Sequence, residues 1–158
     1  MPVEIERKFL VRNERWRQSV TQTQHLRDGL VAVSNGHKVR VRSYGDRATI
    51  TVKTIEQSIS RKEFEYDIPP ADAEELLEHH CGIYRLDKTR NHVLHDGKLW
   101  VVDEYQGILS GVIIAEIELD HESAAFGVPD WAGEEVTHDP NYRKLAMLRR
   151  ALERLEPR

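Results

Sequence analysis

Cysteine is nearly absent from this 158-residue sequence, which contains one, Cys81. A single cysteine excludes a disulfide within the chain and is typical of proteins in reducing compartments. Long apolar runs are absent too. No stretch approaches the roughly 20 residues of a membrane-spanning helix, and the charged N-terminus lacks the apolar core of a signal peptide. We therefore expect a cytoplasmic protein without a membrane partner.

The sequence also lacks a large excess of charge of either sign. Its net charge of -4 argues against a nucleic-acid-binding protein with a generally basic surface. Charged residues nevertheless make up 32% of the chain, above the roughly 25% that is typical of soluble domains. The length fits a single domain, 1–158, that is large enough to bury an apolar core. The informative feature is therefore where the charges lie.

Eight stretches alternate apolar and polar residues with a period of two, which predicts half-buried strands. Short turn sequences such as SNG, YGD and HDG separate several of them. The predicted strands are 3–11, 24–33, 37–44, 47–55, 60–68, 84–96, 98–107 and 111–120.

Two segments carry helical patterns instead. Residues 69–82 begin with prolines and acidic residues and end at a glycine, as helices do. The pattern of residues 139–158 predicts a second helix that Asp139 caps. The apolar stripe of this second helix is Leu145, Leu148, Leu152 and Leu155. A short helix is also expected at 121–126. Eight strands and two substantial helices favour an antiparallel barrel with the helices packed outside it or across one end.

Charged side chains are segregated onto one face of most predicted strands. In the first, Glu4, Glu6 and Lys8 share a face, while Val3 and Ile5 lie on the other. The basic rows hold Arg40, Arg42, Lys53, Lys88 and Arg90, the acidic rows hold Glu4, Glu6, Glu63, Glu65, Glu116 and Glu118, and Asp103 shares a face with Val101 and Tyr105.

Segregated rows are unfavourable for a sheet, because like charges that face each other on neighbouring strands repel. The arrangement makes sense if the basic rows bind a polyanion and the acidic rows bind hard cations. Arg and Lys are preferred partners of phosphate, and carboxylate oxygens are preferred ligands of Mg²⁺ and Mn²⁺. In a closed barrel these charged faces would point inward. Alternation alone leaves open a sandwich with one solvated face.

Eight short motifs follow one another along the chain. They are EIERKFLV, which contains the pattern ExExK, then VRVRS, TVKT, SRKEFE, LDKTR, VVDEYQG, AEIEL and GEEVTHDPNYRKLAM. In this order they resemble the CYTH superfamily, the triphosphate tunnel metalloenzymes, from residue 3 to about residue 148. ExExK alone is a weak signal in so charged a chain, whereas eight motifs in the same order are specific.

The resemblance implies an α+β, mainly β fold: a closed eight-stranded antiparallel β-barrel, or tunnel, with a charged lumen. Helices would lie outside, with the C-terminal helix, including Tyr142 and Lys144, at one tunnel mouth. It implies that the phosphates are bound by Lys8, Arg40, Arg42, Lys53, Lys88 and Arg90. It implies that one or two Mg²⁺ or Mn²⁺ ions are bound by Glu4, Glu6, Glu63, Glu65, Asp103, Glu116 and Glu118. The implied catalytic residues are Glu4, Glu6 and Lys8.

By the same resemblance we expect metal-dependent hydrolysis of inorganic triphosphate to pyrophosphate and phosphate, by a monomer or homodimer with no nucleic-acid partner. Organic triphosphates are the substrates of two alternatives, a thiamine triphosphatase and a class IV adenylate cyclase. An alternative of a different class is a non-catalytic module that binds polyphosphate or nucleotide. Retention of both Glu4 and Glu6 argues against that module, because phosphate binding alone does not need a full acidic row.

Two positions depart from the family pattern. Val101 stands where the family commonly has a glutamate, so one potential metal ligand is lost beside Asp103. Glu104 has the wrong strand parity to replace it. Leu30 stands where compact members often have an aromatic residue, which affects how the tunnel mouth closes or accepts a substrate tail.

Overall fold

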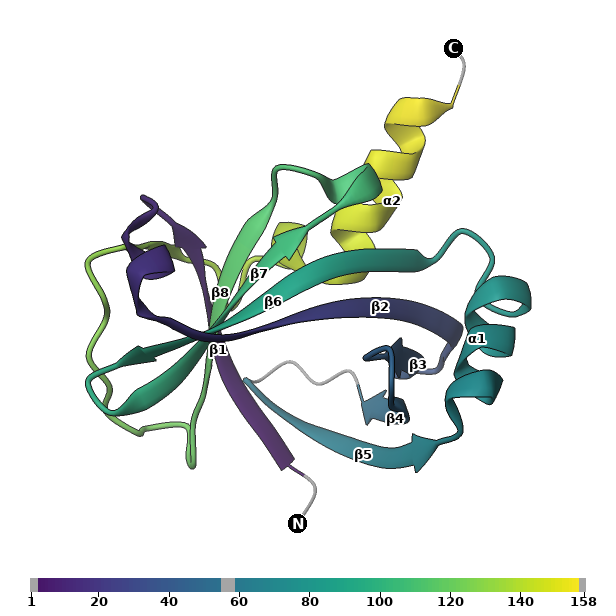
Figure 1. The fold of residues 1–158 in the computed structure, drawn as a ribbon, viewed down its shortest axis with the longest axis horizontal. Coiled ribbons are helices and arrows are strands. Elements are labelled where there is room, and N and C mark those ends of the chain that lie inside the picture. The colour runs from purple at the N-terminus through teal and green to yellow at the C-terminus, as the bar shows by residue number, and fades with distance from the viewer. Residues whose placement is uncertain (1–2, 55–58, 157–158) are drawn as a thin grey trace.

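The computed structural model describes residues 3–54 and 59–156, which form a mainly β molecule with two α-helices (Figure 1). The strands are β1 (Val3–Val11), β2 (Val20–Ser34), β3 (His37–Ser43), β4 (Ala48–Thr54), β5 (Ser60–Ile68), β6 (Arg85–His95), β7 (Lys98–Tyr105), β8 (Ile113–Glu118) and β9 (Ala132–Glu135). The helices are α1 (Pro70–His79) and α2 (Lys144–Leu155), with 3-10 turns η1 (Arg15–Ser19), η2 (Gly107–Leu109) and η3 (Pro140–Tyr142). The strand end predicted at Ile55 and the helix end predicted at 157–158 lie outside the described residues. Within the described part of the chain, no helix has the length and apolar character needed to cross a membrane.

One antiparallel sheet contains these nine strands in the order β5–β4–β3–β2–β6–β7–β8–β1–β9. Eight of them form a ring, because the two halves of β1 pair with different strands. Residues 3–5 pair with β5, and residues 6–10 pair with β8. The eight predicted strands are those of the ring. β9 pairs with the far end of β1 and has no counterpart among the predicted strands, since its sequence AGEE does not alternate.

The largest apolar core lies outside the ring, against the outer faces of β1, β7 and β8. Phe9 and Trp100 face outward there and are buried. The segment between β8 and β9 covers them with Phe126 and Trp131, whose ring centroids lie 5.9 and 5.6 Å from that of Trp100. The short helix predicted at 121–126 is wrong: this segment is a turn followed by irregular chain, which spreads over the core.

Helix α1 covers the outer faces of β2, β3 and β4. Its Leu77 is buried against Val41, and Cys81 just beyond the helix joins the same cluster. The contact with β2 is so close that a Cβ atom at Gly29 would lie 2.5 Å from Sγ of Cys81. The helix predicted over 69–82 is thus present and lies outside the ring.

Helix α2 lies across one end of the ring. Its Met147 and Leu148 pack on Leu86, Tyr105 and Ile114. These last three residues have the same strand parity as the charged rows, so they face the ring interior. The inward faces therefore turn apolar at this end, and α2 buries them.

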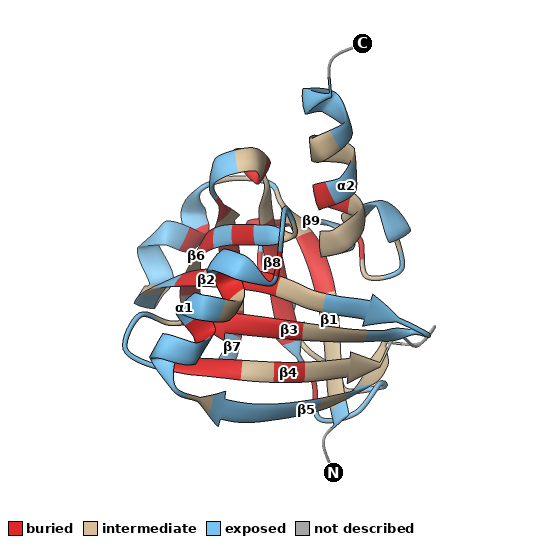
Figure 2. Ribbon diagram, turned by 90° about the vertical axis from the view of Figure 1, so that its right-hand side faces the viewer, coloured by how far each residue is buried: buried red, intermediate tan, exposed pale blue. Residues whose placement is uncertain are grey.

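The apolar stripe predicted for the C-terminal helix is only partly right. Of its four leucines, only Leu148 is fully buried, and Leu155 is 71% exposed. The early turns of α2 meet the ring, whereas its last turn projects beyond it (Figure 2). The backbone N–H of Asn141 donates to Asp139, which therefore caps η3 and not α2.

Candidate functional site

The charged strand faces point into the ring. Lys88 and Asp103 have no exposed surface, and Arg42 and Glu116 are also buried. Alternate residues of the same strands, such as Val102, belong to the apolar cores outside. The ring is therefore inverted relative to most small proteins, with charge inside and apolar side chains outside.

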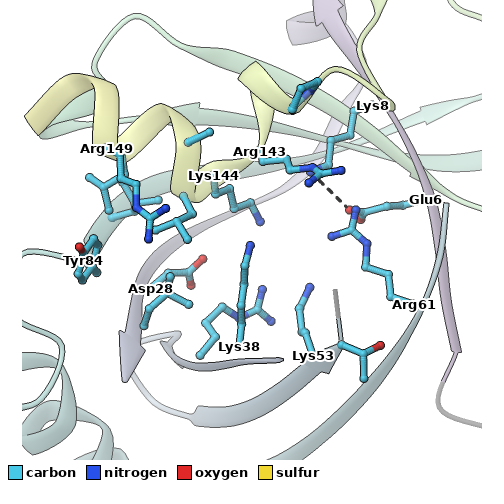
Figure 3. A pocket seen from close by; sticks show the side chains of 18 of the residues that line it. Glu6, Lys8, Asp28, Lys38, Lys53, Arg61, Tyr84, Arg143, Lys144 and Arg149 are labelled. Atoms are coloured by element: carbon cyan, nitrogen blue, oxygen red, sulfur yellow. Dashed lines mark ion pairs between the residues drawn. The ribbon is translucent and has the colours of Figure 1, made fainter. Parts of the chain in front are cut away.

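Two adjoining cavities open in the ring interior and share Glu6, Arg40, Lys53 and Lys144 in their walls. The first, of about 600 Å³, we call the acidic chamber. Its carboxylates are Glu4, Glu6, Glu63, Glu65, Glu116 and Glu118. The second, of about 430 Å³, we call the α2 mouth, because the start of α2 forms one wall of it opposite β3 and β4 (Figure 3).

Cations of β3 and β4 contact the carboxylates of β1 and β5. Nζ of Lys53 lies 3.3 Å from a carboxylate oxygen of both Glu4 and Glu63. Nη2 of Arg40 lies 3.7 Å from Oε1 of Glu63 and 3.9 Å from Oε1 of Glu65. The structure thus brings predicted phosphate-binding and metal-binding residues into direct contact.

Where β1 pairs with β8, one facing pair is of like charge and the next is of opposite charge. Glu6 stands opposite Glu118, and Lys8 stands opposite Glu116. Nζ of Lys8 lies 3.7 Å from Oε1 of Glu6. Glu116 and Glu118 of β8 therefore face the charged row of β1.

Negative charge is in excess in part of the acidic chamber. Burial and a hydrogen bond with Glu63 raise the pKa of Glu4. Burial and the charge of Glu116 raise the pKa of Glu6, and burial together with Glu4 and Glu6 raises that of Glu118. Carboxylates that hinder one another's ionisation in this way favour the binding of a cation.

Helix α2 contributes a cation to the same interior. Burial opposes the ionisation of Glu116, but Lys144 and Lys8 outweigh it and hold the pKa of Glu116 well below its usual range. Burial and the charge of Lys88 lower the pKa of Lys144, and the charge of Glu116 opposes this shift. The side chain of Lys144 points from α2 into the interior (Figure 3).

Two aspartates hold three of the predicted phosphate-binding cations. Asp103 accepts hydrogen bonds from Nζ of Lys88 at 2.8 Å and from Nε and Nη2 of Arg90, both at 2.8 Å. Asp28 accepts from Nε and Nη2 of Arg42 at 2.6 and 2.8 Å, and lies 3.8 Å from Lys88. These five side chains form a continuous chain of alternating charge that fixes the cations in place.

The aspartates stay ionised despite their burial. Burial works against the charged form of Asp103, but Lys88 and Arg90 lower its pKa to about 2. Burial likewise opposes ionisation of Asp28, and Arg42 outweighs it and holds the pKa of Asp28 well below its usual range. Asp28 is absent from the predicted site residues. Asp103, implied as a metal ligand by resemblance, has both oxygens engaged by cations.

The two departures from the family pattern both line the interior. Val101 lines the acidic chamber and stands opposite Glu116 in the β7–β8 register. Leu30 lines the α2 mouth and stands opposite Arg40. Glu104 faces outward, as its parity predicts, and pairs with Arg17 at 2.8 Å.

The donors of the acidic chamber suit a hard divalent cation. Within residues 3–54 and 59–156, no three His, Cys, Asp or Glu side chains converge closely enough to hold a metal. The chamber is nonetheless lined by carboxylates, whose oxygens Mg²⁺ and Mn²⁺ prefer. Burial, and after it the neighbouring carboxylates, raise the pKa values of Glu4, Glu6 and Glu118, and a bound metal would offset both effects.

Comparisons with known proteins point to one family along nearly the whole chain. A family model described as the CYTH domain matches residues 2–150. The inorganic triphosphatase of Acetivibrio thermocellus is 42% identical over 142 residues, 90% of each chain. That of Nitrosomonas europaea is 36% identical over 148 residues, 91% of this chain and 95% of its own. A crystal structure of an inorganic triphosphatase is similar at a TM-score of 0.68 and 33% identity, over 92% of this chain and 93% of that one.

Proposed function

This chain belongs to the CYTH domain family, and we propose that it hydrolyses inorganic triphosphate to pyrophosphate and phosphate with the help of divalent metal ions. Two relatives, 42% and 36% identical, are named inorganic triphosphatases. One observation of the structure carries the proposal: buried cations and a set of carboxylates face a common interior. Cations suit a polyanion and carboxylates suit a hard metal, so the interior suits a metal–triphosphate complex.

We propose that the ring acts as a closed barrel, a tunnel within a single domain. The β1–β5 pairing supports this, because it joins β5, at one end of the sheet, to β1, which lies next to the other end. A tunnel excludes bulk water, which strengthens each interaction between a phosphate oxygen and a cation. It also accommodates an extended chain of phosphoryl groups better than a bulky substrate.

The phosphate-binding residues of this proposal come from four strands, β1, β3, β4 and β6. They are Lys8, Arg40, Arg42, Lys53, Lys88 and Arg90. In the loose transition state of phosphoryl transfer, charge spreads over non-bridging oxygens. Cations that are already held in place stabilise that charge without reorganising. Arg42, Lys88 and Arg90 meet this condition, because Asp28 and Asp103 fix them.

The metal-binding residues of this proposal are the six chamber glutamates, Glu4, Glu6, Glu63, Glu65, Glu116 and Glu118. A bound Mg²⁺ or Mn²⁺ supplies neutralisation of phosphate charge and activation of water. We assign Asp103 a positioning role, because Lys88 and Arg90 engage both of its oxygens. Glu4 and Glu6, on the row that also carries Lys8, would hold a metal ion at the reacting end of the substrate. Lys8 donates to an oxygen of the phosphoryl group that is transferred.

Phosphate release tests the proposal directly. The substrates are inorganic triphosphate, thiamine triphosphate, ATP and pyrophosphate, each with Mg²⁺, with Mn²⁺ and with a chelator. The site variant is Glu6→Gln, and the matched control is Glu134→Gln, which removes an exposed carboxylate of β9. We expect metal-dependent turnover of inorganic triphosphate that Glu6→Gln abolishes and Glu134→Gln retains.

Each alternative has its own result. Preferred turnover of thiamine triphosphate would identify a thiamine triphosphatase, and cyclic nucleotide formed from ATP would identify a cyclase. Tight triphosphate binding without turnover of any substrate would contradict the proposal and leave a binding module.

A further inference from the structure

Lys8 lies where β1 changes from one partner strand to another. On the edge of β1 opposite β8, residues 3–5 pair with β5, whereas Phe9 and Val11 pair with β9. Among the strands that residues 3–54 and 59–156 form, none pairs with Lys8 on this edge. The β1–β9 register also shifts between Phe9 and Val11, and bulges of this kind change the direction of nearby side chains. A regular strand ladder therefore does not hold the main chain of Lys8 on this side.

The residues that follow β9 bond the main chain of Lys8 instead. The backbone N–H of Lys8 donates to Oγ1 of Thr137 at 3.0 Å. The Thr137 hydroxyl in turn donates to the carbonyl oxygen of Lys8 at 3.5 Å, and the backbone N–H of Val136 donates to the same oxygen at 2.8 Å. One threonine hydroxyl thus bonds both polar groups of the Lys8 main chain.

These bonds also affect how Lys8 faces β8. Because the N–H and C=O of Lys8 bond away from β8, Lys8 and Glu116 form a non-hydrogen-bonded pair of the β1–β8 ladder. Facing side chains lie closest in pairs of this kind. The Lys8 side chain is buried in the ring interior, where its Nζ lies 3.7 Å from Oε1 of Glu6.

Thr137 connects Lys8 to helix α2 as well. Thr137 lines the α2 mouth, and the chain continues from it through η3 to Lys144 at the start of α2. Lys8 and Lys144 both line the same cavity, from β1 and from α2 (Figure 3). The Thr137 hydroxyl therefore ties the main chain of one of these cations to the segment that carries the other.

We propose that Thr137 is a positioning residue, whose hydroxyl fixes the main chain of Lys8 so that the Lys8 ammonium meets the phosphoryl group that is transferred. The inference rests on the proposed function, in which Lys8 donates to that group. Thr137 contacts no reacting atom in this role. A displacement of about 1 Å at a group that acts on the reacting atoms can lower a rate about a hundredfold. A hydroxyl that acts only through the main chain of Lys8 therefore has a large effect on turnover.

Steady-state hydrolysis of inorganic triphosphate with Mg²⁺ tests this role in three variants. Thr137→Val removes the hydroxyl and keeps the branched shape, whereas Thr137→Ser keeps the hydroxyl. The matched control is Thr21→Val, which removes an exposed hydroxyl that donates to the backbone carbonyl of His92 on the neighbouring strand. We expect Thr137→Val to lower kcat about ten- to a hundredfold with little change in KM, because Lys8 acts in the transition state. Thr137→Ser and the control should stay close to the wild type.

Amide hydrogen exchange of Lys8, followed by NMR in the metal-free protein, tests the contact without turnover. Loss of the Thr137 hydroxyl leaves the Lys8 N–H without its acceptor. Thr137→Val should therefore speed exchange of this amide about tenfold, whereas Thr137→Ser and Thr21→Val should not. Urea denaturation of each variant shows whether it remains folded.

Three kinetic results would overturn the role of Thr137. An unchanged kcat in Thr137→Val would show that the hydroxyl is not needed, and equal losses in Thr137→Val and Thr137→Ser would exclude the hydroxyl as the cause. A raised KM at unchanged kcat would mean that Thr137 contacts the substrate and does not position Lys8. A wild-type protein that hydrolyses no triphosphate would refute the proposed function, and faster exchange of the Lys8 amide in Thr137→Val would then still support the contact.

Discussion

Lys88 and Asp103 form an ion pair at 2.8 Å between two side chains that the ring encloses completely. Asp103 also accepts two hydrogen bonds from Arg90, so one carboxylate fixes two of the proposed phosphate-binding cations. Removing charges from water is unfavourable unless each is paired. The pair therefore holds cations ready for a substrate at a depth where an unpaired lysine would lose its proton.

Replacement of Asp103 by asparagine should destabilise the folded protein and weaken triphosphate binding. We expect Asp103→Asn to lower the free energy of unfolding by about 3–5 kcal/mol, because Lys88 stays buried without its counter-ion. Triphosphate affinity should fall as well. Urea denaturation and calorimetry measure the two effects. Glu104→Gln, at the neighbouring outward position, should cost less than about 1 kcal/mol. A fully stable Asp103→Asn protein that had lost only metal binding would show that Asp103 is a metal ligand.

The raised pKa of Glu6 predicts a pH dependence of stability in the absence of metal. A carboxyl group that holds its proton more tightly in the folded state contributes stability that declines as pH rises. The difference in unfolding free energy between the wild type and Glu6→Gln should therefore shift against the wild type as pH increases above the usual value of 4.5. Denaturation at a series of pH values in chelator measures it, and Mg²⁺ should reduce the decline. A difference that is flat, or that shifts toward the wild type, would contradict the prediction.

A carboxylate at position 101 should strengthen metal binding. Val101 lines the acidic chamber opposite Glu116, so Val101→Glu adds an oxygen donor there. We expect Mn²⁺ affinity to rise about tenfold, since the charge of the ligand set tunes affinity. The metal-free protein should melt at a lower temperature because of added repulsion. Val101→Gln is the control for shape: equal gains in Mn²⁺ affinity from both variants would rule out the charge as the cause.

Docking of α2 should depend on its early turns. Leu148 is buried against the end of the ring, and we expect Leu148→Ala to lower the free energy of unfolding by about 2–5 kcal/mol. Leu155→Ala, at an exposed position of the same helix, should change it by less than about 0.5 kcal/mol. Urea denaturation compares the two. Similar losses would show that the whole helix packs as the leucine stripe predicts.

Strand parity made the ring interior predictable. The alternation of Glu4, Glu6 and Lys8 with apolar neighbours assigns these side chains to one face whatever the fold. What parity leaves open is which face points inward, and the structure answers this with the apolar cores outside the ring. The leucine stripe predicted that more of α2 is buried than the structure shows, because the end of the ring covers only part of the helix.

The role of Asp28 could not be predicted from the sequence, because it depends on the register of the β2–β3 pairing. An unbroken hairpin counted back from the turn at Asn35 places Asp28 opposite Ser43. The structure has a bulge at Val31, which shifts the pairing by one residue and brings Asp28 opposite Arg42. A bulge of this kind inserts one residue without a strong sequence signal when no glycine marks it. The contact between Asp28 and Arg42 can therefore be identified only from the structure.

The join between β1 and β5 has a consequence for the order of folding. Three register pairs close the ring there, against nine between β2 and β6, although the residues that each pairing joins are similarly far apart in the sequence. The shorter pairing forms late and opens first, because it offers fewer contacts to offset the chain entropy lost on closure. Glu4 and Glu63 lie on the two sides of this join, bridged by Lys53. Closure of the ring and assembly of the acidic chamber are therefore one event, and amide hydrogens of residues 3–5 should exchange faster than those of the β2–β6 ladder.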